Sequence, residues 1–115
     1  MNELSINKRQ CGDVTVLDLK GNITINSGSD VLSETIKKLL EHGSFNILLN
    51  LKRVVYVDSA GLGNMISGYN RVMREGGQIK LVNLTNRVRD LMVITKLLTV
   101  FDVYDDEATA LKNCH

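Results

Sequence analysis

Apolar residues along the chain follow two different spacings. Short apolar runs with the length and composition of buried strands occur at 47–51 and 79–82. Between them, apolar residues recur at steps of three and four, as on one face of an amphipathic helix: Leu62, Met65, Ile66, Tyr69, Val72 and Met73. Asp58 and Ser59 are favourable N-cap residues, so we expect this helix to begin at that pair. The central stretch therefore predicts a strand, a helix and a second strand in succession.

The first part of the chain predicts a hairpin and a helix. Two strands at 5–9 and 14–19 flank a turn-like Cys-Gly-Asp cluster. We expect the chain to leave the second strand at Gly21 and to begin a helix within 27–30, where Ser, Gly and Asp are candidate caps. Gly43 suits the left-handed position that follows the end of this helix. The predicted inward face of the helix consists of Val31, Leu32, Ile36, Leu39 and Leu40.

The last third of the chain continues the alternation of helix and strand. Gly76-Gly77 ends the central helix, and Thr85 can cap a helix that directs Val88, Leu91 and Met92 inward. A short strand at 100–104 precedes acidic residues at 105–107, which suit the first turn of a terminal helix.

The order β-β-α-β-α-β-α-β-α predicts an α/β fold with mostly parallel pairing and right-handed crossovers. We expect one domain spanning residues 1–115, which is long enough to bury its own core. The residues predicted to be mostly buried are Val31, Ile36, Leu39, Leu48, Leu62, Ile66, Tyr69, Leu81, Val88 and Leu91.

Composition narrows the classes of partner. The net charge of +1 suggests neither a nucleic-acid partner nor an anionic membrane surface, and the lack of Trp weakens any base-stacking role. No stretch has the length of a membrane span, and the N-terminal residues do not resemble a signal peptide, so we expect a cytoplasmic protein with no membrane insertion. Cys11 and Cys114 are then expected to be reduced.

The chain offers little catalytic chemistry. Ser59 lacks the first glycine of a nucleophile elbow, and the two histidines are His42, at a predicted helix end, and the terminal His115. A Ser-His-Asp triad is therefore disfavoured. No spacing of Cys, His and Asp predicts a metal site, and Gly61-Leu62-Gly63 is not a nucleotide fingerprint. We expect no enzyme activity, no metal and no cofactor.

Two surface features remain open to interpretation. Basic residues recur among acids and amides, which is typical of a solvated face: Lys52, Arg53, Arg71, Arg74, Arg87 and Arg89. Gly68 lies inside the central helix, where glycine costs on the order of 1 kcal/mol relative to Ala. It shares a face with Gly61, Asn64 and Arg71, opposite the apolar stripe. This face is either a flat strip that a partner's backbone approaches closely or ordinary surface with a tolerated glycine.

Residues 56–63, Tyr-Val-Asp-Ser-Ala-Gly-Leu-Gly, resemble the core motif of the STAS family, named for sulfate transporters and bacterial anti-sigma factor antagonists. The likeness covers nearly the whole chain and includes Gly21, 47–51, Gly76-Gly77, 79–82, Val88, Leu91, Leu97-Leu98 and Phe101. The resemblance implies a STAS-like domain of β-α units wound in sequence, with a mixed sheet.

The resemblance also implies partner switching. In this family the serine that follows the aspartate is phosphorylated by an anti-sigma factor that is also a serine kinase, of the histidine-kinase-like ATPase type. That serine corresponds to Ser59. The unphosphorylated antagonist captures the anti-sigma factor and frees the sigma factor, and a PPM-type phosphatase resets it. The partner-binding residues implied here are Asp58, Ser59, Ala60, Gly61, Asn64, Gly68, Arg71 and Thr24.

The chain departs from the family pattern at two positions. Ala60 stands where many members have a second hydroxyl residue, which leaves Ser59 as the acceptor in the motif. Thr24 stands where several antagonists carry an aspartate, so a different partner or weaker binding follows if that aspartate engages the kinase. The alternative function within the same fold is a constitutive accessory subunit of a transporter ATPase or a signalling scaffold. The intact Asp58-Ser59 pair favours the phosphorylation-switched antagonist over the constitutive subunit.

Overall fold

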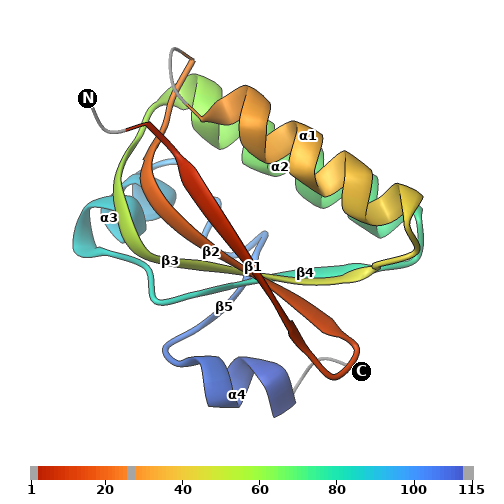
Figure 1. The fold of residues 1–115 in the computed structure, drawn as a ribbon. Helices are drawn as coiled ribbons and strands as arrows, with labels where there is room; N and C mark the ends of the chain where they lie inside the picture. The colour runs from red at the N-terminus through yellow and green to blue at the C-terminus, as the bar shows by residue number, and fades with distance from the viewer. Residues whose placement is uncertain (1–2, 26–27, 113–115) are drawn as a thin grey trace.

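A mixed β-sheet separates two unequal layers of helices (Figure 1). The computed structural model describes residues 3–25 and 28–112 of the chain. The elements within these ranges are β1 (Ser5–Cys11), β2 (Val14–Ile23), α1 (Ser29–Glu41), β3 (Asn46–Val57), α2 (Ser59–Arg74), β4 (Gln78–Val82), α3 (Asn86–Ile94), β5 (Asp102–Tyr104) and α4 (Glu107–Lys112). Their order confirms the predicted alternation of strands and helices.

Each strand of the sheet lies beside its neighbour in sequence, in the order β1-β2-β3-β4-β5. β1 and β2 form an antiparallel hairpin, and the remaining pairs are parallel, which confirms a mixed, mostly parallel sheet. Parallel neighbours need a crossover connection, and α1 and α2 provide the first two. Figure 1 shows α1 and α2 side by side over one face, while α4 lies on the other.

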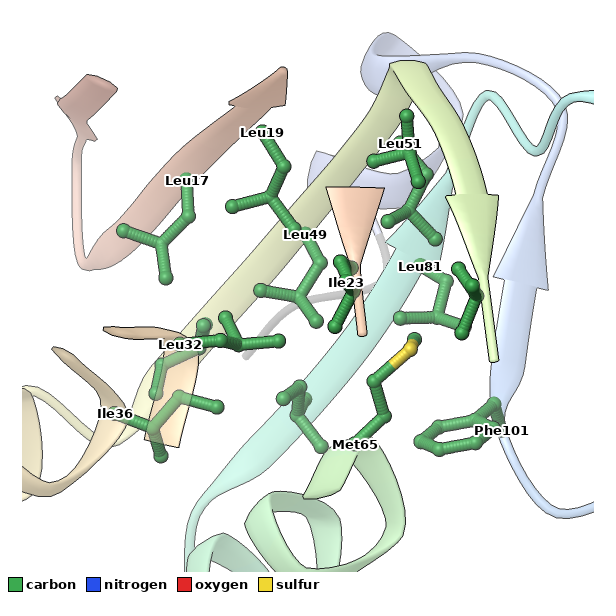
Figure 2. Close-up of a cluster of buried hydrophobic side chains, with 14 of the residues drawn as sticks. Leu17, Leu19, Ile23, Leu32, Ile36, Leu49, Leu51, Met65, Leu81 and Phe101 are labelled. Carbon is green, nitrogen blue, oxygen red and sulfur yellow. The ribbon is translucent and has the colours of Figure 1, made fainter. Parts of the chain in front are cut away.

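The main core fills the space between the sheet and the layer formed by α1 and α2. Leu49 and Leu81 from the sheet meet Met65 from α2, and all three side chains are fully buried (Figure 2). The rings of Tyr69 and Phe101 pack edge to face at 5.3 Å between centroids. The predicted core residues found buried are Ile36, Leu39, Leu48, Leu62, Leu81 and Val88, whereas Ile66, Tyr69 and Leu91 are half-buried against the core.

Two residues predicted to face inward are exposed. Val31 is 48% exposed, because α1 packs through Leu32 and Ile36, and Val31 lies to one side of that line. Met73 is also 48% exposed, since the adjacent Val72 occupies the inward position at the end of α2. Both predictions were wrong for the same reason. A helix turns about 100° per residue, so the outermost members of an apolar stripe fall beyond the buried arc.

The two longest strands extend beyond their predicted ends. β2 continues past Gly21 to Ile23, and β3 continues past Leu51 to Val57. These extensions pair with each other, with register shifts at two points. The ladder between the strands therefore maintains extended structure where the apolar run has ended. The last strand is shorter than expected and begins only at Asp102.

Local signals at the helix ends agree with the structure. The Thr85 side chain accepts a hydrogen bond from the Val88 N–H at 3.4 Å and caps α3. Gly43 follows α1 with φ at 81°, the left-handed region. Gly28 precedes α1, and the candidate cap Ser27 lies outside the described residues. None of the helices in the described ranges is long and apolar enough to cross a membrane.

Candidate partner-binding site

Asp58 joins the end of β3 to the start of α2. Its carboxylate accepts hydrogen bonds from the Gly61 N–H at 2.7 Å and from the Ile25 N–H at 3.1 Å. The first bond caps α2, as the sequence predicts. The second bond reaches the loop that follows β2. One side chain therefore fixes both the start of α2 and the position of the loop.

The same two bonds determine the charge at this junction. The Gly61 N–H, followed by the Ile25 N–H, lowers the pKa of Asp58 below its ordinary value. Hydrogen bonds donated to a carboxylate favour its charged form. Asp58 is therefore ionised at neutral pH, and its negative charge lies beside Ser59.

Gly61 allows α2 to rest directly on the end of β2. A Cβ atom at this position would lie 1.8 Å from the Ile23 carbonyl oxygen, a backbone atom that cannot move aside. The same oxygen accepts a hydrogen bond from the Asp58 N–H at 3.3 Å. The glycine of the motif is thus a packing requirement of the junction and is buried.

Ser59 is the first residue of α2, and its side chain is exposed to solvent. Ala60 beside it is half-buried. The N-terminus of a helix carries partial positive charge and backbone N–H groups that lack partners within the helix. A phosphate attached to Ser59 would lie at a position that favours negative charge.

The predicted docking strip on α2 needs correction. Gly61 and Gly68 are buried, and a Cβ atom at Gly68 would lie 2.8 Å from Cδ1 of Ile36 on α1. The strip therefore faces the sheet end and α1, because α2 packs against both at once. Asn64 is half-buried, and Arg71 is exposed at its edge. The solvent-exposed line of α2 instead consists of Ser59, Gly63, Ser67 and Asn70.

The loop after β2 lies next to this exposed line through its link to Asp58. Thr24 is half-buried and forms a β-bridge with Gly28. Ile25 follows it and is 68% exposed. Ile25 is not among the residues predicted to bind a partner, although an apolar residue among the polar residues of a loop is a signal that could have indicated it. An exposed apolar side chain in the loop that is hydrogen-bonded to Asp58, the residue before Ser59, is suited to contact with a partner.

The remaining candidate residues lie away from this junction or outside the described ranges. His42 caps the end of α1, with Nδ1 2.7 Å from the Lys38 carbonyl oxygen. Cys11 is free and half-buried at the end of β1. Cys114 and His115 are outside the described residues. Over positions 3–25 and 28–112, no group of His, Cys, Asp or Glu could hold a metal ion.

The model of the STAS domain family matches residues 5–110. This chain therefore belongs to the STAS domain family. A relative from Bacillus subtilis (strain 168), named "Anti-sigma-B factor antagonist", is 35% identical over 96 residues. That match covers 84% of this chain and 85% of the relative.

Solved structures have the same fold. An anti-sigma factor antagonist from Mycobacterium paratuberculosis superposes with a TM-score of 0.84 at 20% identity, covering 96% of this chain and 92% of that chain. The Bacillus cell fate determinant SpoIIAA in its phosphorylated form gives a TM-score of 0.71 at 16% identity, covering 94% of this chain and 98% of that chain.

Proposed function

We propose that this chain is an anti-sigma factor antagonist whose binding is switched at Ser59. In its unphosphorylated form it binds an anti-sigma factor, which then releases its sigma factor. The anti-sigma factor is also the kinase: it transfers the terminal phosphoryl group of ATP to Oγ of Ser59, with release of ADP and the hydroxyl proton. A PPM-type phosphatase hydrolyses the phosphoserine and restores binding.

The exposure of Ser59 at the fixed start of α2 carries this proposal. Asp58 and Gly61 are both occupied in fastening α2 to the end of β2 and the loop that follows. Ser59 is therefore displayed on a rigid support, as a group that a kinase must reach. The 35% identity to a named antagonist over most of both chains supports the same function.

The docking face that we propose is the exposed line of α2 together with the loop after β2. Ser59 and Ser67 present small side chains to solvent and Gly63 presents none, so a partner can approach the helix closely. Thr24 and Ile25 flank this line because the Asp58 carboxylate binds their loop to the helix start. The exposed Ile25 provides apolar contact area at its edge.

Phosphorylation is proposed to act by preventing docking and not by changing the fold. A phosphoserine carries a charge of about −1.5 to −2 at pH 7. In the free protein this charge is solvated and favoured by the helix N-terminus, although Asp58 repels it. A partner that covered the site would remove water from the phosphate and leave an uncompensated charge at the interface.

The test compares wild type, Ser59→Ala and Ser59→Asp, each mixed with a candidate anti-sigma factor of the histidine-kinase-like ATPase type. Calorimetry is expected to show binding by wild type and Ser59→Ala, and binding by Ser59→Asp weaker by about tenfold or more, equivalent to about 1.4 kcal/mol. With ATP, intact-mass measurement is expected to show one added phosphoryl group on wild type and none on Ser59→Ala.

Chemical denaturation supplies the control for this test. Ser59 is exposed, so all three variants should have the same free energy of unfolding within about 0.5 kcal/mol. Equal binding by the three variants, with no phosphoryl group on Ser59, would refute the switch and favour the constitutive accessory subunit.

A further inference from the structure

The middle of β3 departs from regular strand alternation at Lys52 and Arg53. Asp18 and Lys20 of β2 pair with Asn50 and Arg53 of β3, so β3 carries one extra residue between these pairs. Leu51 and Val54 on either side are buried in the core, and Lys52 and Arg53 are both exposed. Regular alternation would have directed Arg53 toward the core with Leu51. The bulge instead exposes two consecutive cationic side chains.

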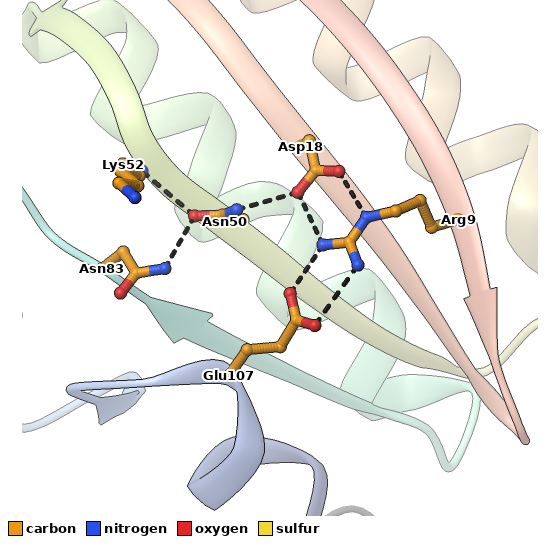
Figure 3. A network of polar contacts seen from close by, with 6 residues as sticks. All are labelled: Arg9, Asp18, Asn50, Lys52, Asn83 and Glu107. Atoms are coloured by element: carbon orange, nitrogen blue, oxygen red, sulfur yellow. Dashed lines mark hydrogen bonds and ion pairs between the residues drawn. The ribbon is translucent and has the colours of Figure 1, made fainter.

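Polar contacts around Asn50 hold this bulge (Figure 3). Oδ1 of the Asn50 side chain accepts hydrogen bonds from the Lys52 backbone N–H at 3.2 Å and from Nδ2 of Asn83 at 3.1 Å. Its amide nitrogen donates to Oδ1 of Asp18 at 2.8 Å. Asn83 itself has φ at 60°, which is uncommon for a residue other than glycine. Three strands and their connections therefore contribute to positioning Lys52.

A cavity of about 410 Å³ lies beside the bulge on the sheet face opposite α1 and α2. Its lining includes Ser5, Asn7, Lys20, Lys52 and Arg53, together with Asp18 and Asn50. This volume falls within the usual range for small-molecule sites. Apart from Leu19 the lining is polar, with hydroxyl and amide groups among the cations, so the cavity suits a polar ligand.

Cationic side chains outnumber carboxylates in the lining of the cavity. Asp18 is the carboxylate of the lining, and Arg9 and Asn50 already donate hydrogen bonds to both of its oxygens. Over the residues that the structure describes, no ion pair joins Lys20, Lys52 or Arg53 to a carboxylate. Three cationic side chains therefore border one cavity, and the single carboxylate of its lining, Asp18, is already hydrogen-bonded to Arg9 and Asn50.

We propose that this cavity binds a small phosphate-bearing molecule through Lys20, Lys52 and Arg53. A phosphate group offers several acceptor oxygens and up to two negative charges, which matches three cations better than a single carboxylate does. Arg53 can form two parallel hydrogen bonds to phosphate, and Lys20 and Lys52 act as point charges. The Ser5 hydroxyl and the Asn7 amide can donate further bonds. This inference is independent of the switch at Ser59.

The test titrates isotope-labelled protein with pyrophosphate and, separately, with glucose 1-phosphate, and follows backbone amide resonances by NMR. We expect saturable shifts at Ser5, Asn7, Lys20, Lys52 and Arg53 with at least one probe at millimolar concentration. Binding of pyrophosphate alone identifies an inorganic ligand, and tighter binding of glucose 1-phosphate identifies a phosphate ester. Both results support the site.

The matched variants are Lys52→Gln/Arg53→Gln and Lys37→Gln/Lys38→Gln. Each removes two exposed cations, the first pair at the cavity and the second on α1. The Lys52→Gln/Arg53→Gln variant should bind the phosphate probe with a Kd about tenfold higher or more, because charge-assisted hydrogen bonds are lost. The Lys37→Gln/Lys38→Gln variant should bind it with an unchanged Kd. The proposal is overturned by an absence of saturable shifts with both probes, by shifts confined to the start of α2, or by equal weakening in both variants.

Discussion

The two faces of the sheet are stabilised by different interactions. Under α1 and α2, aliphatic side chains from the inner strands meet those of both helices in one continuous core. On the opposite face, the short helix α4 covers a small apolar cluster that contains Val16, Leu48, Val82 and Ala110. Beside this cluster the sheet carries charged and amide side chains instead of apolar ones (Figure 3).

The charged part of the second face depends on Arg9. Its guanidinium donates to Asp18 on β2, with Nε 2.5 Å from Oδ2, and to Glu107 at the start of α4, with Nη2 2.6 Å from Oε1. A helix of six residues has little stability of its own. Arg9 therefore helps to hold α4 against the hairpin. The stability of the apolar face is therefore sensitive chiefly to lost volume, whereas the stability of the opposite face also responds to the ionisation of its acids.

The largest expected effect is the loss of volume in the apolar face. Leu49→Ala should lower the free energy of unfolding by about 2–5 kcal/mol, because the side chain is fully buried. Ile66→Ala is expected to cost less, since Ile66 is half-buried at the edge of the same core. Chemical denaturation of both variants measures the difference. Equal losses would contradict the view that burial in this layer sets the cost.

A smaller effect is expected where α1 and α2 meet. Gly68→Gln should destabilise by about 1–3 kcal/mol, because its side chain must enter the contact with Ile36. Gly63→Gln in the same helix is the matched control. Nothing lies within 4 Å of a Cβ at Gly63, so improved helix propensity should stabilise that variant by up to about 1 kcal/mol. A gain in stability for Gly68→Gln as well as for Gly63→Gln would place Gly68 at the surface after all.

The contrast between Gly63 and Gly68 shows which features of the fold can be predicted from the sequence and which cannot. The caps at Asp58 and Thr85 and the turn at Gly43 were predictable, because each depends on residues within a few positions. The apolar stripe of α2 correctly indicated that Met65 and Val72 face the core. The stripe did not reveal that α2 buries a second face against α1, because that contact depends on where α1 lies in the fold. Gly68 was therefore assigned to the wrong surface.

The polar face was less predictable for a related reason. Arg9 and Glu107 are 98 positions apart, and no local pattern connects them. The bulge at Lys52 and Arg53 arises from pairing with β2, so the sequence suggested only a solvated basic pair. The exposed position of Ser59 at the start of α2 could be predicted, because the strand end and the helix start that place it are contiguous in the chain.

The smallest expected effect tests the response of the second face to pH. The Arg9 guanidinium lowers the pKa of Asp18 below 3.8, with a further contribution from the Asn50 amide. Asp18 thus binds fewer protons in the folded state than in the unfolded state. The stability that it contributes is complete above the unfolded pKa and is lost as pH falls through the lower folded pKa.

Asp18→Asn should therefore flatten the acid side of the stability curve below about pH 4, where the unfolded wild-type chain binds a proton at Asp18 that the folded protein still excludes. Asp58 and Asp106 also have lowered pKa values, so some dependence on pH will remain. Val16→Ala removes apolar volume from the same face without removing an acid, and it should shift the whole curve downward with its slope intact. Free energies of unfolding measured by denaturant titration at several pH values distinguish the two variants. Parallel curves for wild type and Asp18→Asn would show that Arg9 and Asp18 do not stabilise this face through their charges.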